Sequence, residues 1–290
     1  MSAHKKLWKA AEPAPAEFVE QFCTDMVPHL TEAAPLQHAA LLAHLLYQRE
    51  MTTAEAVTAF FRSSYKDDLH DPFLMKGMPE ASNRIAKAIR AGEPIAVYGD
   101  FDTDGVSAVT LLMQVIRAMG GNIAPYIPHR EREGYGLNKS AIDALAEQGT
   151  RLLITVDCGI SNVEEVAHAR AVGLDVIVTD HHTPPPILPA ALAVVNPKQP
   201  GCPYPFKQLV GVGIAFKLVQ ALVKRGLHLP LRGRDMLDVV ALGTVADMGP
   251  LNGENRVLVK FGIQALRETQ RPGLLALTPG GWPFAATHRC

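Results

Sequence analysis

The segment AVYGDFDTDGVSA, residues 96–108, places three aspartates at alternate positions between two apolar runs. The residues before them are typical of a buried strand, and the residues from Val106 onward repeat at helical spacing. Asp100, Asp102 and Asp104 are therefore expected where a strand passes into a helix. Like charges this close repel one another, so their presence indicates that a cation binds there.

Strand and helix patterns alternate from residue 93 onward. Each helical stretch between the first four strands ends at or near a glycine. Because parallel neighbours need crossover connections, the alternation predicts an α/β fold with a doubly wound, mainly parallel five-stranded sheet. The predicted strands are residues 94–100, 122–128, 151–157, 174–180 and 192–197, and the helices between the first four are residues 106–120, 138–149 and 161–173.

Helical patterns flank this region on both sides. We expect a helical N-terminal segment over residues 1–90, an α/β domain over residues 91–277 and helices in its C-terminal part, after residue 210. Residues 278–290 show no periodic pattern and are predicted to form an irregular tail.

Composition sets broad limits on the class of protein. Lys and Arg number 28 against 29 Asp and Glu, so a net charge of −1 neither indicates nor excludes a nucleic-acid partner. The four cysteines have no CxxC spacing, which argues against a disulfide framework and a thiolate zinc site. No apolar run approaches the roughly 18 residues of a membrane span. The sequence predicts a soluble, cytoplasmic protein without membrane association.

Carboxylates follow three of the predicted strands. Asp100, Asp157 and Asp180 each stand at the carboxyl end of a strand, and in an open parallel sheet these ends line the ligand crevice. Any one of them alone is explained as a turn or helix-cap residue. Three together favour a shared site.

Imidazoles and one more carboxylate extend this pattern. His181 and His182 follow Asp180 directly, and three prolines from Pro184 stiffen the exit. Asp247 closes an apolar helical run, where the helix dipole disfavours a negative charge and a positive group is expected to hold it. Oxygen and imidazole donors predominate, so the predicted metal is Mn²⁺ or Mg²⁺.

A basic loop, HREREGYG, follows the second predicted strand on the same rim. Arg130 and Arg132 are its candidates for contacting a backbone phosphate. A solvated loop without such a role remains the alternative.

Four motifs, in their order and separations, resemble the DHH phosphoesterase superfamily: YGDFDTDGVSA, TVDCGIS, TDHH and ALGTVADMGPL. Within it, the chain is similar to the RecJ family of single-strand-specific exonucleases. Segments outside the catalytic motifs, among them IPHREREGYGLN and NPKQPGCPYPFKQLVGVGIAFKL, carry the same similarity, and the resemblance covers roughly residues 35–277.

The resemblance implies two divalent ions and a set of catalytic residues. One ion would be held by Asp104, Asp157, His181 and Asp247, and the second by Asp102 and the bridging Asp157, with Asp100 holding or recruiting it. His182 would hydrogen-bond the scissile phosphate. Asp180 would orient an imidazole through a hydrogen bond without binding the metal itself. The implied catalytic residues are Asp102, Asp104, Asp157, His181, His182 and Asp247.

The implied activity is metal-dependent 5′ to 3′ exonuclease action on single-stranded DNA, in DNA repair and recombination. A single-strand-binding protein or a helicase is the implied protein partner. RecJ proteins continue into a second domain, DHHA1, and an OB-type domain, which this chain is expected to lack.

Two other functions stay open. One is hydrolysis of short oligonucleotides, cyclic dinucleotides or pyrophosphate; the pyrophosphatase branch carries a histidine four residues before the second aspartate, where this chain has Tyr98. The other is non-catalytic DNA binding. Relatives of that kind show eroded acidic motifs, whereas the aspartates and both histidines are present here.

Overall fold

The computed structural model describes residues 11–27 and 38–277. The chain divides into two compact units, Met1–Ser64 and Tyr65–Cys290. The predicted tail, residues 278–290, lies outside the described residues.

The first unit is a small helical cluster with its own apolar core, to which Phe22 and Val57 belong. The hydroxyl of Thr53 accepts a hydrogen bond from the N–H of Ala56 at 3.2 Å and so caps the last of its helices. Its described elements are α1 (Ala16–Gln21), the π-helix η1 (Phe22–Met26), α2 (Ala39–Tyr47) and α3 (Ala54–Phe61).

A five-stranded, all-parallel sheet forms the centre of the second unit. Its strands are β1 (Ile95–Gly99), β2 (Ile123–Tyr126), β3 (Leu152–Val156), β4 (Asp175–Thr179) and β5 (Ala193–Val195). Each strand lies inside its predicted range, and the predicted α/β fold is confirmed. The strand order is β2-β1-β3-β4-β5, so the direction of winding changes between β1 and β3. Open sheets bind their ligands at such a switch point.

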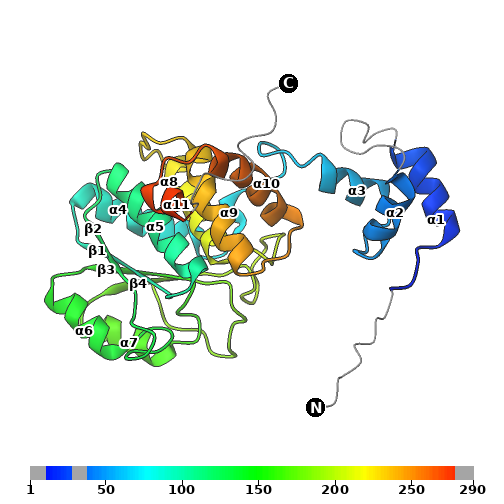
Figure 1. The fold of residues 1–290 in the computed structure, drawn as a ribbon. Coiled ribbons are helices and arrows are strands. Elements are labelled where there is room, and N and C mark those ends of the chain that lie inside the picture. Colours follow the sequence, from blue (N-terminus) through cyan, green and yellow to red (C-terminus); the bar gives the residue numbers. More distant parts are fainter. Residues whose placement is uncertain (1–10, 28–37, 278–290) are drawn as a thin grey trace, which may run out of the picture. The chain divides into compact units, whose positions relative to one another are not determined.

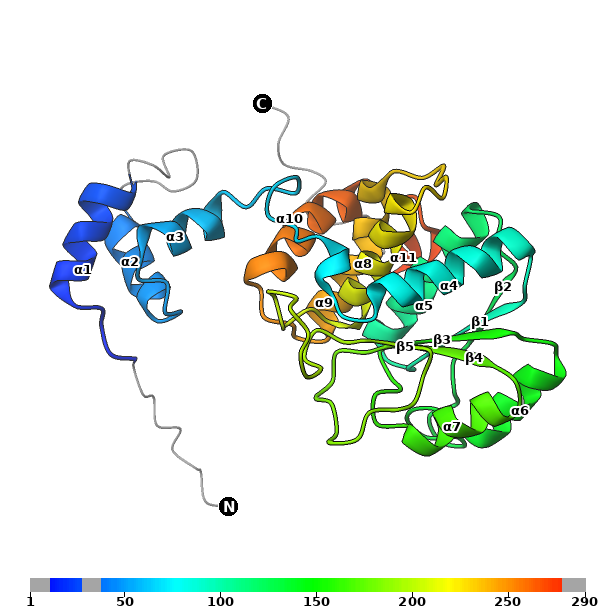
Figure 2. The same ribbon diagram turned by 180° about the vertical axis from the view of Figure 1, so that it is seen from behind.

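Side chains alternate between the two faces of the sheet because a strand has a period of two. Ile95 and Val97 face one apolar cluster, whereas Ala96 and Tyr98 face the other. Figures 1 and 2 show the corresponding helical layers. The first cluster includes residues of α4 (Met78–Ala91), α5 (Thr103–Ala118), α8 (Gly211–Lys224) and α9 (Leu237–Ala246), and the second includes residues of α6 (Lys139–Glu147) and α7 (Val163–Ala171).

Helix α4 packs against α8 and β5 in the second unit, although the sequence assigns it to the segment 1–90. Its buried Ala81 and Ile85 belong to the apolar core on the first face of the sheet. The remaining elements are η4 (Pro72–Leu74), η5 (Gly233–Met236), α10 (Gly253–Arg267), which packs on α9, and α11 (Pro272–Ala276). Among the described helices, none is both long and apolar enough to cross a membrane.

Helix α5 begins three residues before its predicted start at residue 106. The cause is Asp102, whose Oδ1 accepts a hydrogen bond from the N–H of Gly105 at 2.9 Å and caps the helix. Asp104 therefore lies inside the first turn of α5 instead of in a loop.

Candidate metal centre

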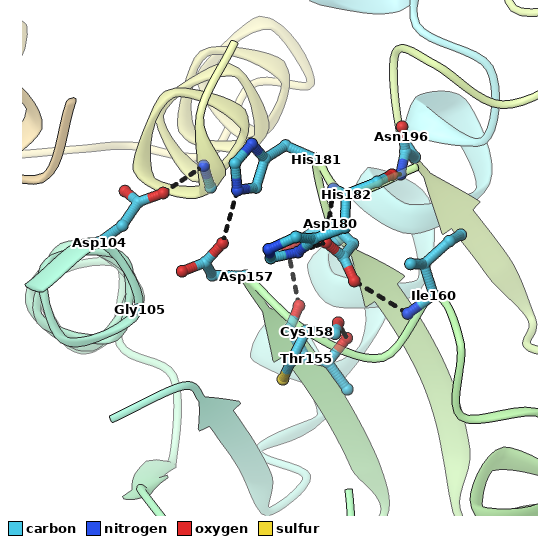
Figure 3. A network of polar contacts seen from close by, with 12 residues as sticks. Asp104, Gly105, Thr155, Asp157, Cys158, Ile160, Asp180, His181, His182 and Asn196 are labelled. Atoms are coloured by element: carbon cyan, nitrogen blue, oxygen red, sulfur yellow. Dashed lines mark hydrogen bonds and ion pairs between the residues drawn. The ribbon is translucent and has the colours of Figure 1, made fainter. Parts of the chain in front are cut away.

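The acidic residues meet where β1, β3 and β4 end. Asp100, Asp157 and Asp180 are each the first residue after a strand, and all three are buried. They lie at and beside the switch point between β1 and β3. Figure 3 shows Asp157 and the Asp180–His182 segment facing the start of α5, which carries Asp104.

The acidic loop is closed tightly onto the start of α5. A Cβ on Gly105 would lie 2.5 Å from the carbonyl oxygen of Asp100 and 2.7 Å from its nitrogen. Only a residue without a side chain allows this approach. The Oδ1 of Asp100 accepts the N–H of Phe101 at 2.7 Å, which leaves its second carboxylate oxygen for another partner.

Asp104 is held by the amino end of α8. Its Oδ2 accepts the N–H of Gly211 at 2.6 Å, and its Oδ1 accepts the N–H of Val212 at 2.9 Å. These N–H groups have no partner within the helix, and they carry its positive dipole end. The carboxylate of Asp104, which is 1% exposed, is thereby fixed in orientation.

Asp157 and His181 approach each other without forming a hydrogen bond. The Oδ1 of Asp157 lies 3.1 Å from the Nε2 of His181. Both atoms are buried, and within the described part of the chain neither has a hydrogen-bond partner. Orphaned buried polar atoms are costly. Two of them this close together suit a shared divalent cation.

Asp247 also approaches this imidazole. It is the C-cap of α9, and its Oδ2 lies 3.9 Å from the Nε2 of His181. The side chain of Asp247 is 25% exposed, so this edge of the site faces solvent. A metal ion bound by Asp247 and His181 would be the positive group expected beside Asp247.

The structure thus brings the predicted metal ligands together. In each of three groups, one potential ligand atom per residue lies within 4.8 Å of the others. Asp157 and His181 are each in two groups, but only Asp157, with two carboxylate oxygens, can be shared between neighbouring ions. The groups are Asp104, His181 and Asp247; Asp100, Asp102 and Asp157; and Asp157, His181 and His182.

The potential ligand atoms at this site are of the kind that a hard divalent cation prefers. Carboxylate oxygens and imidazole nitrogens suit Mn²⁺ and Mg²⁺, whereas thiolates select softer metals. Cys158, although next to Asp157, is fully buried in the apolar cluster that contains Tyr98. The predicted residues therefore fit Mn²⁺ or Mg²⁺.

Burial and mutual repulsion disfavour the charged forms of Asp104 and Asp157. Burial raises the pKa of Asp104 well above its ordinary value, and the charge of Asp157 raises it further. The pKa of Asp157 is raised in the same way by burial and by Asp102. Burial lowers the pKa of His181, and the charge of His182 lowers it further. A divalent cation would reverse this balance by stabilising the ionised carboxylates and the neutral imidazole.

His182 is positioned differently from His181. Its Nδ1 lies 2.7 Å from the Oδ1 of Asp180, and its backbone N–H donates to the same oxygen at 3.0 Å. Asn196 donates to the carbonyl of His182 at 2.9 Å. The hydrogen bond to Asp180 raises the pKa of His182 to about 9. Although burial alone would raise the pKa of Asp180, its bonds to His182 bring that pKa below its ordinary value.

The sequence does not predict that an aromatic side chain, Tyr135, lies at this site. The hydroxyl of Tyr135 donates to the carbonyl of Asp157 at 3.3 Å, and its ring meets that of His182 edge to face at 6.0 Å. Gly134 and Gly136 flank it with φ of 78° and 83°. The sequence signal for Tyr135 is the GYG triplet, in which both glycines permit left-handed backbone.

The two arginines predicted to contact a phosphate, Arg130 and Arg132, have different surroundings. The guanidinium of Arg130 lies 4.1 Å from the ring centroid of Phe101. In the sequence, Phe101 stands between Asp100 and Asp102. Burial raises the pKa of Asp100, and the charge of Arg130 offsets part of that rise. Arg132 is exposed on the same loop, where its backbone N–H donates to the carbonyl of His129 at 3.1 Å. The structure brings Arg130, but not the Arg132 side chain, against the acidic loop.

Comparison with known proteins places this geometry in a family. The profile of the DHH family, N-terminal domain, matches residues 94–244. The single-stranded-DNA-specific exonuclease RecJ of Bacillus subtilis is 45% identical over 278 residues, which are 96% of this chain and 33% of that protein. The chain thus spans about a third of the length of this relative.

Two solved structures share the architecture. A crystal structure of exonuclease RecJ bound to manganese has a TM-score of 0.64 at 40% identity, over 70% of this chain and 51% of that one. The structure of RecJ in complex with Mn²⁺ from Thermus thermophilus has a TM-score of 0.72 at 31% identity, over 93% of this chain and 37% of that one. The predicted resemblance is confirmed: this chain belongs to the DHH family.

Proposed function

We propose that this chain carries the catalytic part of a metal-dependent exonuclease that degrades single-stranded DNA from its 5′ end. The support is the identity of 45% with a RecJ exonuclease across nearly the whole chain and the cluster of metal-type side chains. Residues 91–277 would form the catalytic domain together with helix α4, which packs against α8 and β5, and the rest of residues 1–90 would be a helical N-terminal segment.

The observation that carries the proposal is the orphaned pair of Asp157 Oδ1 and His181 Nε2. They lie 3.1 Å apart in a buried site and, among the described residues, have no hydrogen-bond partner. Bound Mn²⁺ or Mg²⁺ ions, two in number, would lower the pKa of an attacking water and neutralise the leaving oxygen of a phosphodiester.

Each carboxylate has a distinct place in this arrangement. Asp104, Asp157, His181 and Asp247 would hold one ion, and Asp157 would bridge to a second held with Asp102 and Asp100. Asp104 can hold its orientation without the ion because α8 donates one N–H to each of its oxygens. Asp102 uses one oxygen to cap α5 and keeps the other for a ligand role.

His182 is the candidate donor to the scissile phosphate. With the Nδ1 proton directed at Asp180, its Nε2 is left to donate. A pKa of about 9 keeps His182 protonated at neutral pH. A protonated imidazole stabilises the charge that develops on the phosphate oxygens.

Substrate contacts extend from this centre to the basic loop. Arg130, stacked on Phe101 beside the acidic residues, would bind a backbone phosphate of the same strand, and Arg132 would add a second contact from the loop. This function also predicts a cytoplasmic location, work in DNA repair and recombination, and a single-strand-binding protein or a helicase as partner.

Tyr98 argues against the pyrophosphatase alternative. Its ring is buried on the face covered by α6 and α7, where it stacks on Tyr126 at 4.9 Å. Its hydroxyl donates to the carbonyl of Gly136 and accepts from Asn138. The side chain at this position therefore serves packing and offers no ligand to a metal.

The test compares substrates on the full chain with Mn²⁺. We expect a single-stranded oligonucleotide labelled at its 5′ end to release labelled mononucleotide at once, and a 3′-labelled one to release it only after a lag. A blunt duplex, pyrophosphate and a cyclic dinucleotide should react at least about tenfold more slowly, since every 1.36 kcal/mol of transition-state binding is tenfold in rate. Preferred hydrolysis of pyrophosphate or a cyclic dinucleotide, or immediate release from the 3′ label, would contradict the proposal.

A further inference from the structure

Two helix glycines face the carboxylates of the metal centre. Gly211 is the first residue of α8, and Gly243 lies inside α9. Glycine weakens a helix relative to alanine, and neither of these two residues has a positive φ that would call for it. Their presence therefore needs another explanation, which the space around them supplies.

Gly211 lies directly against Asp157. A Cβ at this position would be 2.6 Å from the Cβ of Asp157 and 2.7 Å from both its Cγ and its Oδ1. Rotation of the Asp157 side chain cannot move its own Cβ, so the contact would displace backbone. Asp157 has little freedom to move, because its φ is 60° and its N–H donates to Thr179 at 3.1 Å.

Gly243 stands in the same relation to Asp104. A Cβ there would lie 2.8 Å from the Oδ1 of Asp104 and 2.8 Å from a methyl group of Val212. The carboxylate is held on its other side by the N–H groups of Gly211 and Val212. An added methyl group would therefore turn Asp104 away from its present orientation.

We infer that Gly211 and Gly243 are positioning residues of the metal centre: the absence of their side chains sets where Asp157 and Asp104 stand. This inference rests on the proposed metal-dependent function. The two glycines act on different ligands. Asp157 is in two of the ligand groups, whereas Asp104 is in one.

A difference between the two variants follows. Gly211→Ala displaces the shared Asp157 and should weaken the binding of both ions. Gly243→Ala disturbs Asp104 and should weaken only the ion that Asp104, His181 and Asp247 would hold. Changes to groups that orient metal ligands commonly reduce affinity by about 10- to 100-fold.

Gly213 provides a matched control on α8. The three atoms nearest to a Cβ there all belong to the side chain of Leu209, with Cδ2 at 3.1 Å and Cβ at 3.7 Å. That methyl group is the movable end of an apolar side chain. Gly213→Ala should therefore leave Mn²⁺ affinity within about twofold of the original, since glycine to alanine in a helix otherwise changes only helix propensity.

The experiment is calorimetric titration of Mn²⁺ into the full chain and its three alanine variants, with thermal unfolding in a chelator as the measure of folding. We expect both Mn²⁺ affinities to fall at least about tenfold in Gly211→Ala and one to fall in Gly243→Ala. Excess Mn²⁺ should restore kcat in Gly243→Ala, which a general loss of structure would not allow. If Gly211→Ala fails to fold, Gly243→Ala decides, because its two nearest contacts are the end of a carboxylate and a methyl group, and its third, the Cβ of Ser107, is at 3.2 Å.

Failure of the inference is distinct from failure of the function. Unchanged Mn²⁺ binding in both Gly211→Ala and Gly243→Ala, or an equal loss in Gly213→Ala, overturns the inference alone. Tight Mn²⁺ binding by the unsubstituted chain without hydrolysis of single-stranded DNA overturns the function and leaves the inference standing on the variants. Absence of Mn²⁺ binding in the unsubstituted chain overturns both.

Discussion

The Oδ1 of Asp180 lies 2.7 Å from the Nδ1 of His182 and accepts the backbone N–H of the same residue at 3.0 Å. The other oxygen of Asp180 accepts the N–H of Ile160 at 2.9 Å. A carboxylate fixed in this way sets both the orientation and the proton of the imidazole. His182 is therefore held in one orientation, with Nε2 left as the donor for its proposed role at the phosphate.

Asp180→Asn should change the pH dependence of catalysis. The carboxylate raises the pKa of His182 to about 9, so His182 loses its proton, and the donor with it, as pH rises through that value. Without the charge, this loss should come at lower pH, toward the ordinary histidine pKa of about 6.5, and kcat near pH 8 should fall about 30-fold. The measurement is kcat against pH on a single-stranded oligonucleotide.

Asp175→Asn is the matched control for this change. Asp175 begins β4 at the opposite end of the strand and pairs with Arg84 at 2.6 Å. Its substitution should leave the pH profile unchanged. An identical alkaline limb in Asp180→Asn and the unsubstituted chain would refute the role given to Asp180.

Stability of the metal-free protein should fall as pH rises. Burial and mutual repulsion raise the pKa values of Asp104 and Asp157 in the folded chain, so above the ordinary carboxyl range the folded state binds more protons than the unfolded state. The free energy of unfolding then decreases with pH until these groups ionise. Melting temperatures in a chelator, from about pH 5 to about pH 9, measure this slope.

Asp157→Asn should flatten that slope, because an amide does not titrate. Mn²⁺ should stabilise the unsubstituted chain increasingly as pH rises, since its binding displaces protons. Equal slopes in the chelated variant and the chelated original would show that Asp157 is ionised in the folded, metal-free protein.

Substitutions of Asp104 and Asp100 should have different effects, the first mainly on metal binding and the second mainly on turnover. Asp104 has a ligand position beside His181 and Asp247, so Asp104→Ala should abolish tight Mn²⁺ binding. Asp100 would hold or recruit the second ion, so Asp100→Ala should mainly reduce kcat. Calorimetry and steady-state kinetics on both variants check this division, and the reverse order would show the assignment to be wrong.

A buried ion pair between α8 and α10 should be costly to break by removal of one partner. The Nζ of Lys217 lies 2.5 Å from the Oε1 of Glu254, and both side chains are 0% exposed. Glu254 also accepts hydrogen bonds from Tyr204 and from the N–H of His70. Lys217→Met leaves this carboxylate buried without its cation and should cost about 3–5 kcal/mol in the free energy of unfolding.

The exposed pair of Lys224 and Asp71 is the comparison. Their charged atoms lie 3.1 Å apart, but the side chains are 50% and 48% exposed. Lys224→Met should therefore cost about 1 kcal/mol or less. Denaturant unfolding of both variants measures the contrast, and comparable losses would mean that burial does not set the strength of the Lys217 pair.

Sequence patterns were sufficient for the sheet and for the place of the acids. Asp100, Asp157 and Asp180 follow buried strands, and the geometry of a parallel sheet alone brings their ends to one edge. The apolar repeat begins at Val106 and predicts the start of α5 there, whereas the helix begins at Thr103, where Asp102 caps it. Asp102 is both the cap of this helix and a candidate metal ligand. A sequence pattern alone does not distinguish these two roles.

Contacts between distant segments could not be predicted in the same way. The N–H groups of Gly211 and Val212 reach Asp104 across more than 100 positions of the chain, and no periodicity records that approach. Lys217 likewise stands in an apolar helical run as a lone charge. Its partner Glu254 becomes apparent only when α10 is in place.

The dependence of single-strand hydrolysis on Mn²⁺ and on Asp157 tests the central claim most directly. Release of labelled mononucleotide from a 5′-labelled single strand should rise with Mn²⁺ and disappear in a chelator. Asp157→Asn should reduce it at least about 1,000-fold, since a shared ligand of both ions is lost, while the chelated variant keeps its folded circular dichroism spectrum. Release that needs no divalent ion, or that persists in Asp157→Asn, would contradict this account.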